Sequence, residues 1–314
     1  MIYKWKITEK DIGKRLDVFL TNELDDLTRS AIAKRIKQGN AKINEKIASV
    51  HTFLRQDDLV FFDSELKLTT KEKQIEEKNS KKFSSLKPFI IQETDDWIVL
   101  NKPSGLLVHP DAKHKNHTLV DLLIDHYPKI VKVGENPERP GIVHRLDKKV
   151  SGLMVVAKNQ HAFDELKKQF SQRKTKKTYL ALIYGYLPKK EGEIRFKIAR
   201  SQDKPRMAAL PEHADNGKIA WTHYKVLEEK NMASKVELDI FSGRTHQIRV
   251  HLFALNHPVI GDDLYQPKNI KLIPTNRIML QSICLQFHDL NTDELLTFTI
   301  PPLPDLQKLF ESLK

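Results

Sequence analysis

The chain has 314 residues, 39% hydrophobic and 30% charged, which predicts a globular protein with one large core and a smaller domain. No segment approaches the roughly 20 consecutive apolar residues of a membrane-spanning helix, and the first residues lack the apolar run of a secretion signal, so we expect a cytoplasmic protein. The single cysteine, Cys284, excludes an internal disulfide and a Cys-rich metal site, whereas the net charge of +12 favours a polyanionic partner.

Basic residues gather in two segments of the chain. Residues 29–46 carry six cations and one acid, and residues 158–190 carry nine cations and two acids. Clusters of this kind favour a nucleic acid as the partner more than an even scatter of charge would. Taken alone, either cluster fits a solvated helix face equally well.

The chain divides into three blocks by composition. Residues 1–64 have the pattern of a compact unit, and residues 88–314 have that of a larger domain. Between them, residues 65–87 contain seven Lys and four Glu with several Ser and Thr, which is typical of a polar linker.

The first block has the pattern of two helices followed by a small β ribbon. Leu16, Phe19 and Leu20 fall on one helical face, and a second helix is expected to begin near Ser30 and to end at Gly39. Short strands are then expected at residues 41–43 and 59–62, with turns at 44–45 and 57–58.

Cations occupy the polar sides of the second predicted helix, at Lys34, Arg35 and Lys37, and Arg29 directly precedes it. We take these four residues as candidate contacts to RNA. A unit of two helices and a β ribbon, in which the second helix exposes basic residues, is typical of a small RNA-binding module.

This block resembles the S4 RNA-binding domain. The matching residues are Arg15-Leu16-Asp17, Arg29-Ser30 and Gly39-Asn40-Ala41-Lys42-Ile43-Asn44. At Glu45 the sequence departs from that family, which usually has Gly in this turn. The resemblance implies an accessory domain that binds RNA.

In the last block, strands outnumber helices. Strands are expected at residues 97–100, 106–108, 153–157 and 179–184, and helices at 118–126, 160–173 and 245–255. No Gly-rich phosphate loop follows a strand, which counts against a nucleotide-driven enzyme. We therefore predict an α+β domain built on a mixed sheet.

One aspartate lies on a constrained loop that leads into a predicted strand. Pro140-Gly141 precedes the run His144-Arg145-Leu146-Asp147, and Ser151-Gly152 opens the strand. Catalytic groups are often held on such loops, but a lone Asp is more often a cap or a surface charge. The case for Asp147 depends on the residues around it.

A second polar segment supplies a cation for this carboxylate. Arg249 follows His246 by three residues and Thr245 by one helical turn, so that the three can share a face. Arg249 can form an ordinary salt bridge, or it can pair with a buried Asp147 and hold the pKa of that carboxyl low. An ionised, desolvated carboxylate is a usable nucleophile or base.

A tyrosine lies in the third segment, Lys177-Thr178-Tyr179-Leu180-Ala181. On an apolar strand Tyr179 is more often a core residue than a catalytic one. Alternatively, it can stack on an extruded base and offer its hydroxyl for proton transfer.

Together these segments resemble the RluA family of pseudouridine synthases. The resemblance runs from about Trp97 to the C-terminus and includes the runs Asn101-Lys102-Pro103-Ser104-Gly105, Gly261-Asp262-Asp263-Leu264-Tyr265 and Ile300-Pro301-Pro302-Leu303-Pro304. It implies a mostly antiparallel sheet with flanking helices, and conversion of uridine to pseudouridine in RNA without a cofactor. Val150 is a departure, because the family usually has Thr before its Ser-Gly step.

The resemblance also implies roles for single residues. Asp147 is the catalytic aspartate, Arg249 pairs with it, Tyr179 contacts the flipped uridine and Arg145 replaces the displaced base. His144 and Arg244, in the same motifs, are further candidate substrate contacts. Asp147 then attacks C1′, attacks the uracil ring or removes the 2′ proton, and the sequence leaves these three routes open.

No metal site is expected. His246 and His251 are five residues apart rather than four, and no nearby Glu completes a zinc site. The expected partner is RNA, most simply large-subunit ribosomal RNA or a pre-ribosomal particle, bound by a monomer. The alternatives are a synthase acting on tRNA, a non-catalytic RNA-binding or ribosome-assembly factor, and a metal-dependent nuclease.

Overall fold

The computed structural model of the protein describes residues 2–24, 27, 29–64, 83–111, 116–266 and 271–313. The chain forms two compact units, residues 1–78 and 79–314. Most of the expected linker lies outside the described residues. Its last residues do not behave as a linker, because Phe83 and Leu86 are buried in the core of the larger unit. The larger unit therefore begins before residue 88, where we had expected it to start.

The small unit packs two helices on a four-stranded antiparallel sheet. Its elements are β1 (Ile2–Lys6), η1 (Glu9–Asp11), α1 (Leu16–Glu23), α2 (Arg29–Lys37), β2 (Ala41–Ile43), β3 (Lys46–Ile47) and β4 (Leu59–Asp63). The strands lie in the order β1-β4-β2-β3. Leu16, Phe19 and Leu20 are buried in the core of this unit, as their helical spacing predicts. Gly39, at φ +82°, follows the end of α2.

The turn between β2 and β3 places two consecutive non-glycine residues in the left-handed region. Asn44 has φ +50° and Glu45 has φ +66°. The Asn44 side chain secures the turn, because its Oδ1 accepts from the backbone N of Leu59 at 2.9 Å and its Nδ2 donates to Asp58 at 2.7 Å. Glu45 has no such compensation at its own backbone, where glycine would adopt the same φ without steric cost.

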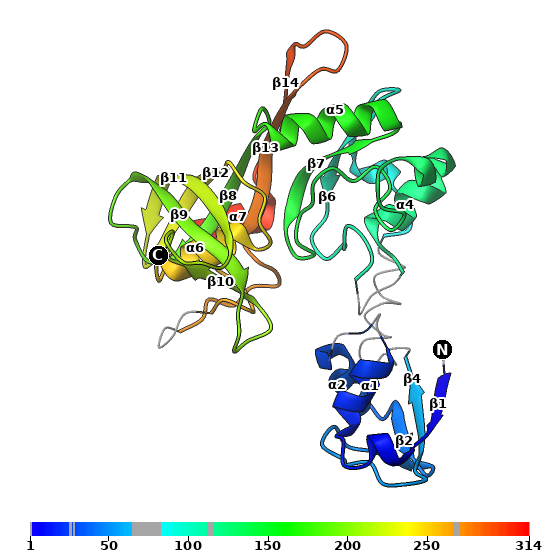
Figure 1. The fold of residues 1–314 in the computed structure, drawn as a ribbon. Helices are drawn as coiled ribbons and strands as arrows, with labels where there is room; N and C mark the ends of the chain where they lie inside the picture. The colour runs from blue at the N-terminus through cyan, green and yellow to red at the C-terminus, as the bar shows by residue number, and fades with distance from the viewer. Residues whose placement is uncertain are drawn as a thin grey trace. The chain divides into compact units, whose positions relative to one another are not determined.

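The larger unit is built on one ten-stranded sheet (Figure 1). Its strands are β5 (Ile90–Glu93), β6 (Trp97–Lys102), β7 (Ser151–Ala157), β8 (Lys176–Tyr184), β9 (Glu191–Arg200), β10 (Met207–Leu210), β11 (Lys218–Lys230), β12 (Ala233–Ile240), β13 (Leu280–His288) and β14 (Leu295–Thr299). Nine of them follow the order β10-β9-β11-β12-β8-β13-β7-β6-β5, and β14 pairs with β13. The β13–β7 pair is parallel and the other strand pairs are antiparallel, which confirms the mixed, mostly antiparallel sheet.

Helices flank this sheet. They are η2 (Lys87–Phe89), α4 (Leu119–His126), η3 (Pro128–Lys132), α5 (Gln160–Ser171), α6 (Gln247–Ala254) and α7 (Pro304–Ser312). Thr118 begins α4 with a capping box, in which its side chain and that of Asp121 bond each other's backbone N–H groups. α6 begins later than expected, because His246 at φ +57° cannot continue a right-handed helix and instead precedes its first residue.

One predicted strand is wrong. Residues 106–108 form only an isolated bridge, between Leu107 and Thr118, and the chain turns on both sides of it. Leu106 and Val108 are nevertheless buried, so their apolar character reports burial rather than a strand.

A glycine determines how closely two strands of the sheet approach each other. Gly152, in β7, has φ +120°, and a Cβ atom there would lie 2.1 Å from the carbonyl oxygen of Ser282 in β13. Only glycine allows this contact, which fixes where the loop before β7 meets the sheet. Among the described residues, no helix is both long and apolar enough to cross a membrane.

Replacing Glu45 by glycine is expected to stabilise the small unit by about 1 kcal/mol, because a side chain in the left-handed region costs roughly 1–2 kcal/mol. Hydrogen–deuterium exchange of the full chain, read on peptides that contain β2 and β4, would then slow. Glu45→Ala is the matched control, since alanine keeps the strained φ. Equal exchange in the two variants would contradict the assigned strain.

Candidate active site

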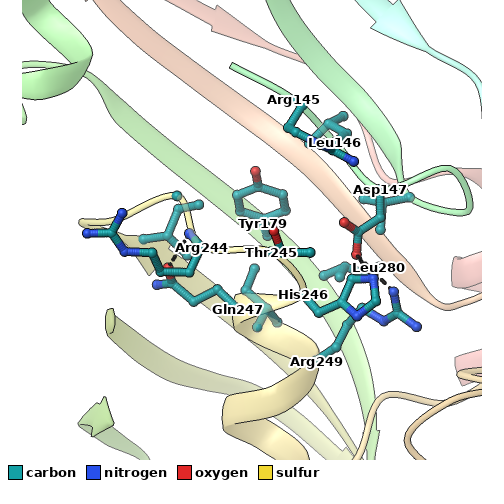
Figure 2. A pocket seen from close by; sticks show the side chains of 14 residues that line it. Arg145, Leu146, Asp147, Tyr179, Arg244, Thr245, His246, Gln247, Arg249 and Leu280 are labelled. Atoms are coloured by element: carbon teal, nitrogen blue, oxygen red, sulfur yellow. Dashed lines mark hydrogen bonds and ion pairs between the residues drawn. The ribbon is translucent and has the colours of Figure 1, made fainter. Parts of the chain in front are cut away.

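A hollow lies where the loop before β7, the strand β8 and the start of α6 meet (Figure 2). We call it the Asp147 hollow. It is lined by Arg145, Leu146, Asp147, Val150, Tyr179, Ile240, Gly243, Arg244, Thr245, His246, Gln247, Ile248, Arg249 and Leu280. The three segments that the sequence singled out therefore meet at one site, although they are far apart along the chain.

The centre of the site is an arginine held between two carboxylates. Arg249 donates from Nη1 to Oδ2 of Asp147 at 2.9 Å. It donates from Nε and Nη2 to the two oxygens of Asp262, at 2.6 and 2.9 Å. A bidentate pair fixes the plane of the guanidinium, so the remaining nitrogen can point only at Asp147.

Burial differs along this chain of charges. The side chains of Asp262 and Arg249 are 0% and 6% exposed, whereas that of Asp147 is 19% exposed. Burial alone would lower the pKa of Arg249, but the hydrogen bonds and charge of Asp262, followed by those of Asp147, raise it above its ordinary value. Arg249 is therefore a permanent cation, and Asp147 is the carboxylate of the pair that remains open to the hollow.

Asp262 belongs to the site through its bonds to Arg249, although no spacing in the sequence predicted it there. It lies after Gly261 on the loop between α6 and β13, and its Oδ1 also accepts from the backbone N of Leu264 at 2.9 Å and of Tyr265 at 3.1 Å. These backbone donors orient the carboxylate independently of Arg249. The run that contains it carried the family resemblance, but no spacing in the sequence linked Asp262 to Arg249.

The loop that carries Asp147 is tied to a neighbouring loop by its backbone. The carbonyl of Lys148 accepts from the backbone N of Gly105 at 2.8 Å, and that of Lys149 accepts from Ser104 at 2.6 Å. Lys102, which is 0% exposed, donates to the carbonyls of Pro103, Leu106 and Lys148. Burial lowers the pKa of Lys102 to about 7, and the charge of Asp147 opposes that effect.

Tyr179 reaches the hollow from β8, and Figure 2 shows its ring between Arg145 and Thr245. The residue is 6% exposed. Burial, and then the negative charge of Asp147, raise the pKa of its hydroxyl. The phenol is therefore neutral at physiological pH and is available as a proton donor or a stacking surface.

His246 was grouped with Arg249 on one helix face, but the structure gives it another position. It lies before the first turn of α6, with Nε2 3.8 Å from Oδ2 of Asp147. Its Nδ1 is 3.0 Å from the hydroxyl of Tyr265. Burial lowers the pKa of His246 while Asp147 acts in the opposite direction, so the ring is neutral near pH 7 and lies beside the same carboxylate.

The three candidate substrate contacts of this unit are placed differently. Arg145 is exposed and lines the hollow, as expected of a residue that meets RNA. Arg244 is at the rim, with Nε donating to the carbonyl of Ile219 at 3.2 Å, and it extends away from Asp147 (Figure 2). His144 does not line the Asp147 hollow: its ring stacks on Phe170 at 4.6 Å and its Nε2 accepts from the backbone N of Val155 at 3.0 Å. Burial lowers the pKa of His144 to about 3, so this ring is neutral.

The candidate RNA contacts of the small unit also divide. Arg29 is exposed but pairs with the buried Asp17 at 2.9 Å, and Lys37 is exposed. Lys34 is half-buried. Arg35 departs from the expectation of an exposed cation, because its guanidinium donates to the carbonyls of Ser64 and Ala31 and the residue is buried. The helical spacing predicted which face of α2 carries Arg35, but it could not predict that Ser64, just after the end of β4, would bond to this side chain.

The other groups considered from the sequence can be placed as well. In the part of the chain that the structure describes, no three His, Cys, Asp or Glu side chains gather as a metal site would require. Cys284 is a half-buried free thiol, and burial raises its pKa. Val150 is buried and lines the Asp147 hollow, where a threonine would add a hydroxyl close to the carboxylate.

Taken together, the hollow offers a carboxylate held by an arginine, a neutral phenol and an exposed guanidinium beside apolar walls. The apolar walls include Leu146, Ile240 and Leu280. A flat, partly polar ring that carries hydrogen-bond donors and acceptors fits such a site, and a carboxylate excluded from bulk water can act on it as nucleophile or base.

Several known proteins are similar to this chain in sequence and in fold. The model of the RNA pseudouridylate synthase family matches residues 96–254. An uncharacterized RNA pseudouridine synthase of Aquifex aeolicus is 38% identical over 275 residues, which cover 86% of this chain and 82% of that protein. Ribosomal large subunit pseudouridine synthase D of Haemophilus influenzae is 32% identical over 98% of this chain and 94% of its own. The structure of human RNA pseudouridylate synthase domain containing 1 superposes with a TM-score of 0.57 at 30% identity, over 70% of this chain and 86% of that one.

Asp262→Asn is expected to destabilise the larger unit by about 3 kcal/mol, because it leaves the buried Arg249 without its bidentate counter-charge. Urea unfolding of the purified variants measures this. Asp263→Asn, the next residue, is the control: its exposed pair with Lys149, at 2.8 Å, should contribute about 1 kcal/mol or less. Similar losses in the two variants would show that the central ion pairs do not hold the site.

Proposed function

The chain belongs to the RNA pseudouridylate synthase family, and on this premise we propose that Asp147 reacts with a target uridine in large-subunit ribosomal RNA. The observation that carries the proposal is the 2.9 Å ion pair between Asp147 and Arg249, in a hollow that also contains Tyr179 and Arg145. No other carboxylate lines that hollow among the described residues.

Membership establishes the reaction. The chain is an RNA pseudouridine synthase, an isomerase whose substrate is RNA, and its sheet has the fold of the family. The reaction cleaves the N1–C1′ bond of a uridine, turns the uracil and joins its C5 to C1′. It leaves the composition of the nucleotide unchanged, because the proton lost from C5 is balanced by the proton gained at N1.

The geometry supports a role for each of four side chains. Arg249, fixed by Asp262, orients the Asp147 carboxylate and places a positive charge 2.9 Å from it. Tyr179 offers a ring to the extruded base and a neutral hydroxyl for proton transfer. Arg145 is exposed on the same loop as Asp147, which supports its assignment as the residue that fills the space left by the base. Each of the three routes open to Asp147 requires the same ionised carboxylate at the same place.

Base extrusion is the main binding cost of this reaction. Unstacking and unpairing a nucleotide costs a few kcal/mol, which stacking on Tyr179 and contacts from Arg145 offset. The apolar walls around Asp147 exclude water from the extruded ring, and charges within the hollow therefore interact more strongly than they would in solvent.

The target is inferred from the relatives and from the small unit. Synthase D of Haemophilus influenzae, which aligns over nearly the whole chain, acts on the large ribosomal subunit by its name. We assign residues 1–64 as an S4-like RNA-binding domain, with Arg29, Lys34 and Lys37 toward RNA, and the larger unit as the catalytic domain. A monomer that acts in the cytoplasm on ribosomal RNA or an assembling particle fits this assignment.

Asp147→Asn is expected to abolish pseudouridine formation, with a loss of about a thousandfold or more, because the amide keeps the shape of the side chain but not its charge. Tritium release from RNA that carries [5-³H]uridine measures the reaction. Asp215→Asn, an exposed aspartate in the loop between β10 and β11, is the control and should retain wild-type release. Undiminished release by the Asp147 variant would refute the assigned role.

The target is tested by mapping pseudouridines at single-nucleotide resolution in RNA from a deletion strain. We expect one or more sites in large-subunit ribosomal RNA to disappear and to return with the wild-type gene but not with Asp147→Asn. Loss of sites in tRNA alone would favour a tRNA synthase. Unchanged RNA would favour a ribosome-assembly factor that binds RNA without modifying it.

A further inference from the structure

A second hollow adjoins the Asp147 hollow. It shares Arg145 and Tyr179 with it, and its other walls include Arg139, Phe170 and Lys177. We call it the Lys177 hollow. Because the two share wall residues, a group bound in the second hollow would lie next to a base held in the first.

Lys177 is a buried cation with no counter-charge. The residue is 9% exposed, and its Nζ lies 5.1 Å from the centre of the Phe170 ring. Among the described residues, no carboxylate or carbonyl oxygen bonds to its ammonium group. Burial lowers the pKa of Lys177 to about 8, so near neutral pH the group carries a charge that the fold leaves uncompensated.

Other cations surround the same hollow. Arg139 is exposed and makes no ion pair within the described part of the chain. Its charge acts unfavourably on Arg145 and on the buried His109, which also lines the hollow. Asp111 and Asp147 favour the charged form of Arg145. Among the described residues, no ion pair joins an acid to Arg139 or to Lys177. Like charges gathered in this way destabilise the free protein and favour a bound anion.

The floor of the Lys177 hollow is formed by two stacked rings. The His144 ring stacks on Phe170 at 4.6 Å with an interplanar angle of 25°, and its Nε2 is engaged by the backbone of β7. Lys177 lies over the same Phe170 ring. The ammonium group is therefore held in place by packing rather than free to move to an acid elsewhere.

We propose that Lys177 and Arg139 bind a phosphodiester group next to the target uridine and so hold the RNA backbone while the base is extruded. The proposal rests on the proposed function, because it takes RNA in the Asp147 hollow as given. A phosphodiester suits the site because every nucleotide carries one and because two uncompensated cations match its charge. An unstacked neighbouring base would need no cation at this place.

Lys177→Met tests the proposal through the salt dependence of RNA binding. The probe is an in vitro transcript of large-subunit ribosomal RNA, bound over a series of KCl concentrations. Loss of one phosphate contact should reduce the slope of log K against log [KCl] by about 0.7–0.9 and weaken binding about tenfold at low salt. Lys177→Arg keeps the charge and should restore most of the slope.

Lys176→Met is the matched control. Lys176 is the preceding residue of β8, but it is exposed and pairs with Asp239 at 3.3 Å. Its removal should leave the slope and the affinity close to those of the wild type. A slope in the Lys177→Met variant equal to that of this control would overturn the proposal.

The stability of the free protein gives a second readout that a structural role would not produce. Removing a buried, unpaired charge should leave the Tm of Lys177→Met unchanged or raise it by a few degrees, although RNA binding is weaker. A lower Tm together with an unchanged salt slope would show that Lys177 serves the fold. Arg139→Met, at an exposed position, should reduce the slope without any effect on folding.

Different results would contradict the proposed target and the proposed phosphate site. If the wild type leaves the transcript unmodified but Lys177→Met still has the smaller slope, the proposed target falls and the phosphate site stands. If the wild type forms pseudouridine and the Lys177, Arg139 and Lys176 variants all bind with the same slope, the phosphate site falls and the function stands.

Discussion

The catalytic unit depends on one arginine shared by two carboxylates. Asp262 accepts two hydrogen bonds from Arg249 and has no exposed surface, so it commits the guanidinium to a single orientation. The remaining nitrogen meets Asp147, which is the partner open to solvent. If Arg249 were paired with Asp147 alone, one hydrogen bond would hold it. That single bond would offset only part of the free energy lost when the guanidinium is removed from water. With Asp262 in place, the cation becomes a fixed part of the site rather than a mobile counter-ion.

The fold supplies the constraints that bring these groups together. The side chains of Lys102 and Ser104 hold the Asp147 loop by hydrogen bonds to its backbone carbonyls. The loop enters the sheet at Gly152, where only glycine allows β7 to approach β13 so closely. Tyr179 comes from β8, which pairs with β13, and Arg249 comes from α6. Mostly antiparallel pairing places these distant segments side by side, and the hollow that results has apolar walls and charged groups at one end. A site of that kind can hold an uncharged ring against an ionised carboxylate.

The sequence predicted the parts of this structure that depend on periodicity or on motifs. Helices α1, α4 and α5 and strands β6 and β8 follow their apolar spacing, and the resemblance to the RluA family is confirmed. What failed depends on tertiary context. Residues 106–108 are apolar because a loop buries them, and α6 starts late because His246 adopts a left-handed conformation. Lys177 belongs to the basic segment 158–190, and no pattern in the sequence shows that its ammonium group would pack on Phe170.

Arg249 orients Asp147 for the reaction, rather than merely holding the fold together. The most direct test of this role is the single-turnover rate of pseudouridine formation by Arg249→Gln, measured with enzyme in excess of RNA and compared with its affinity for that RNA. The account predicts that the rate falls by at least about a hundredfold while the affinity changes by only a few-fold, because Arg249 acts on Asp147 and not on the RNA backbone. A variant that stays folded and reacts at the wild-type rate would contradict it.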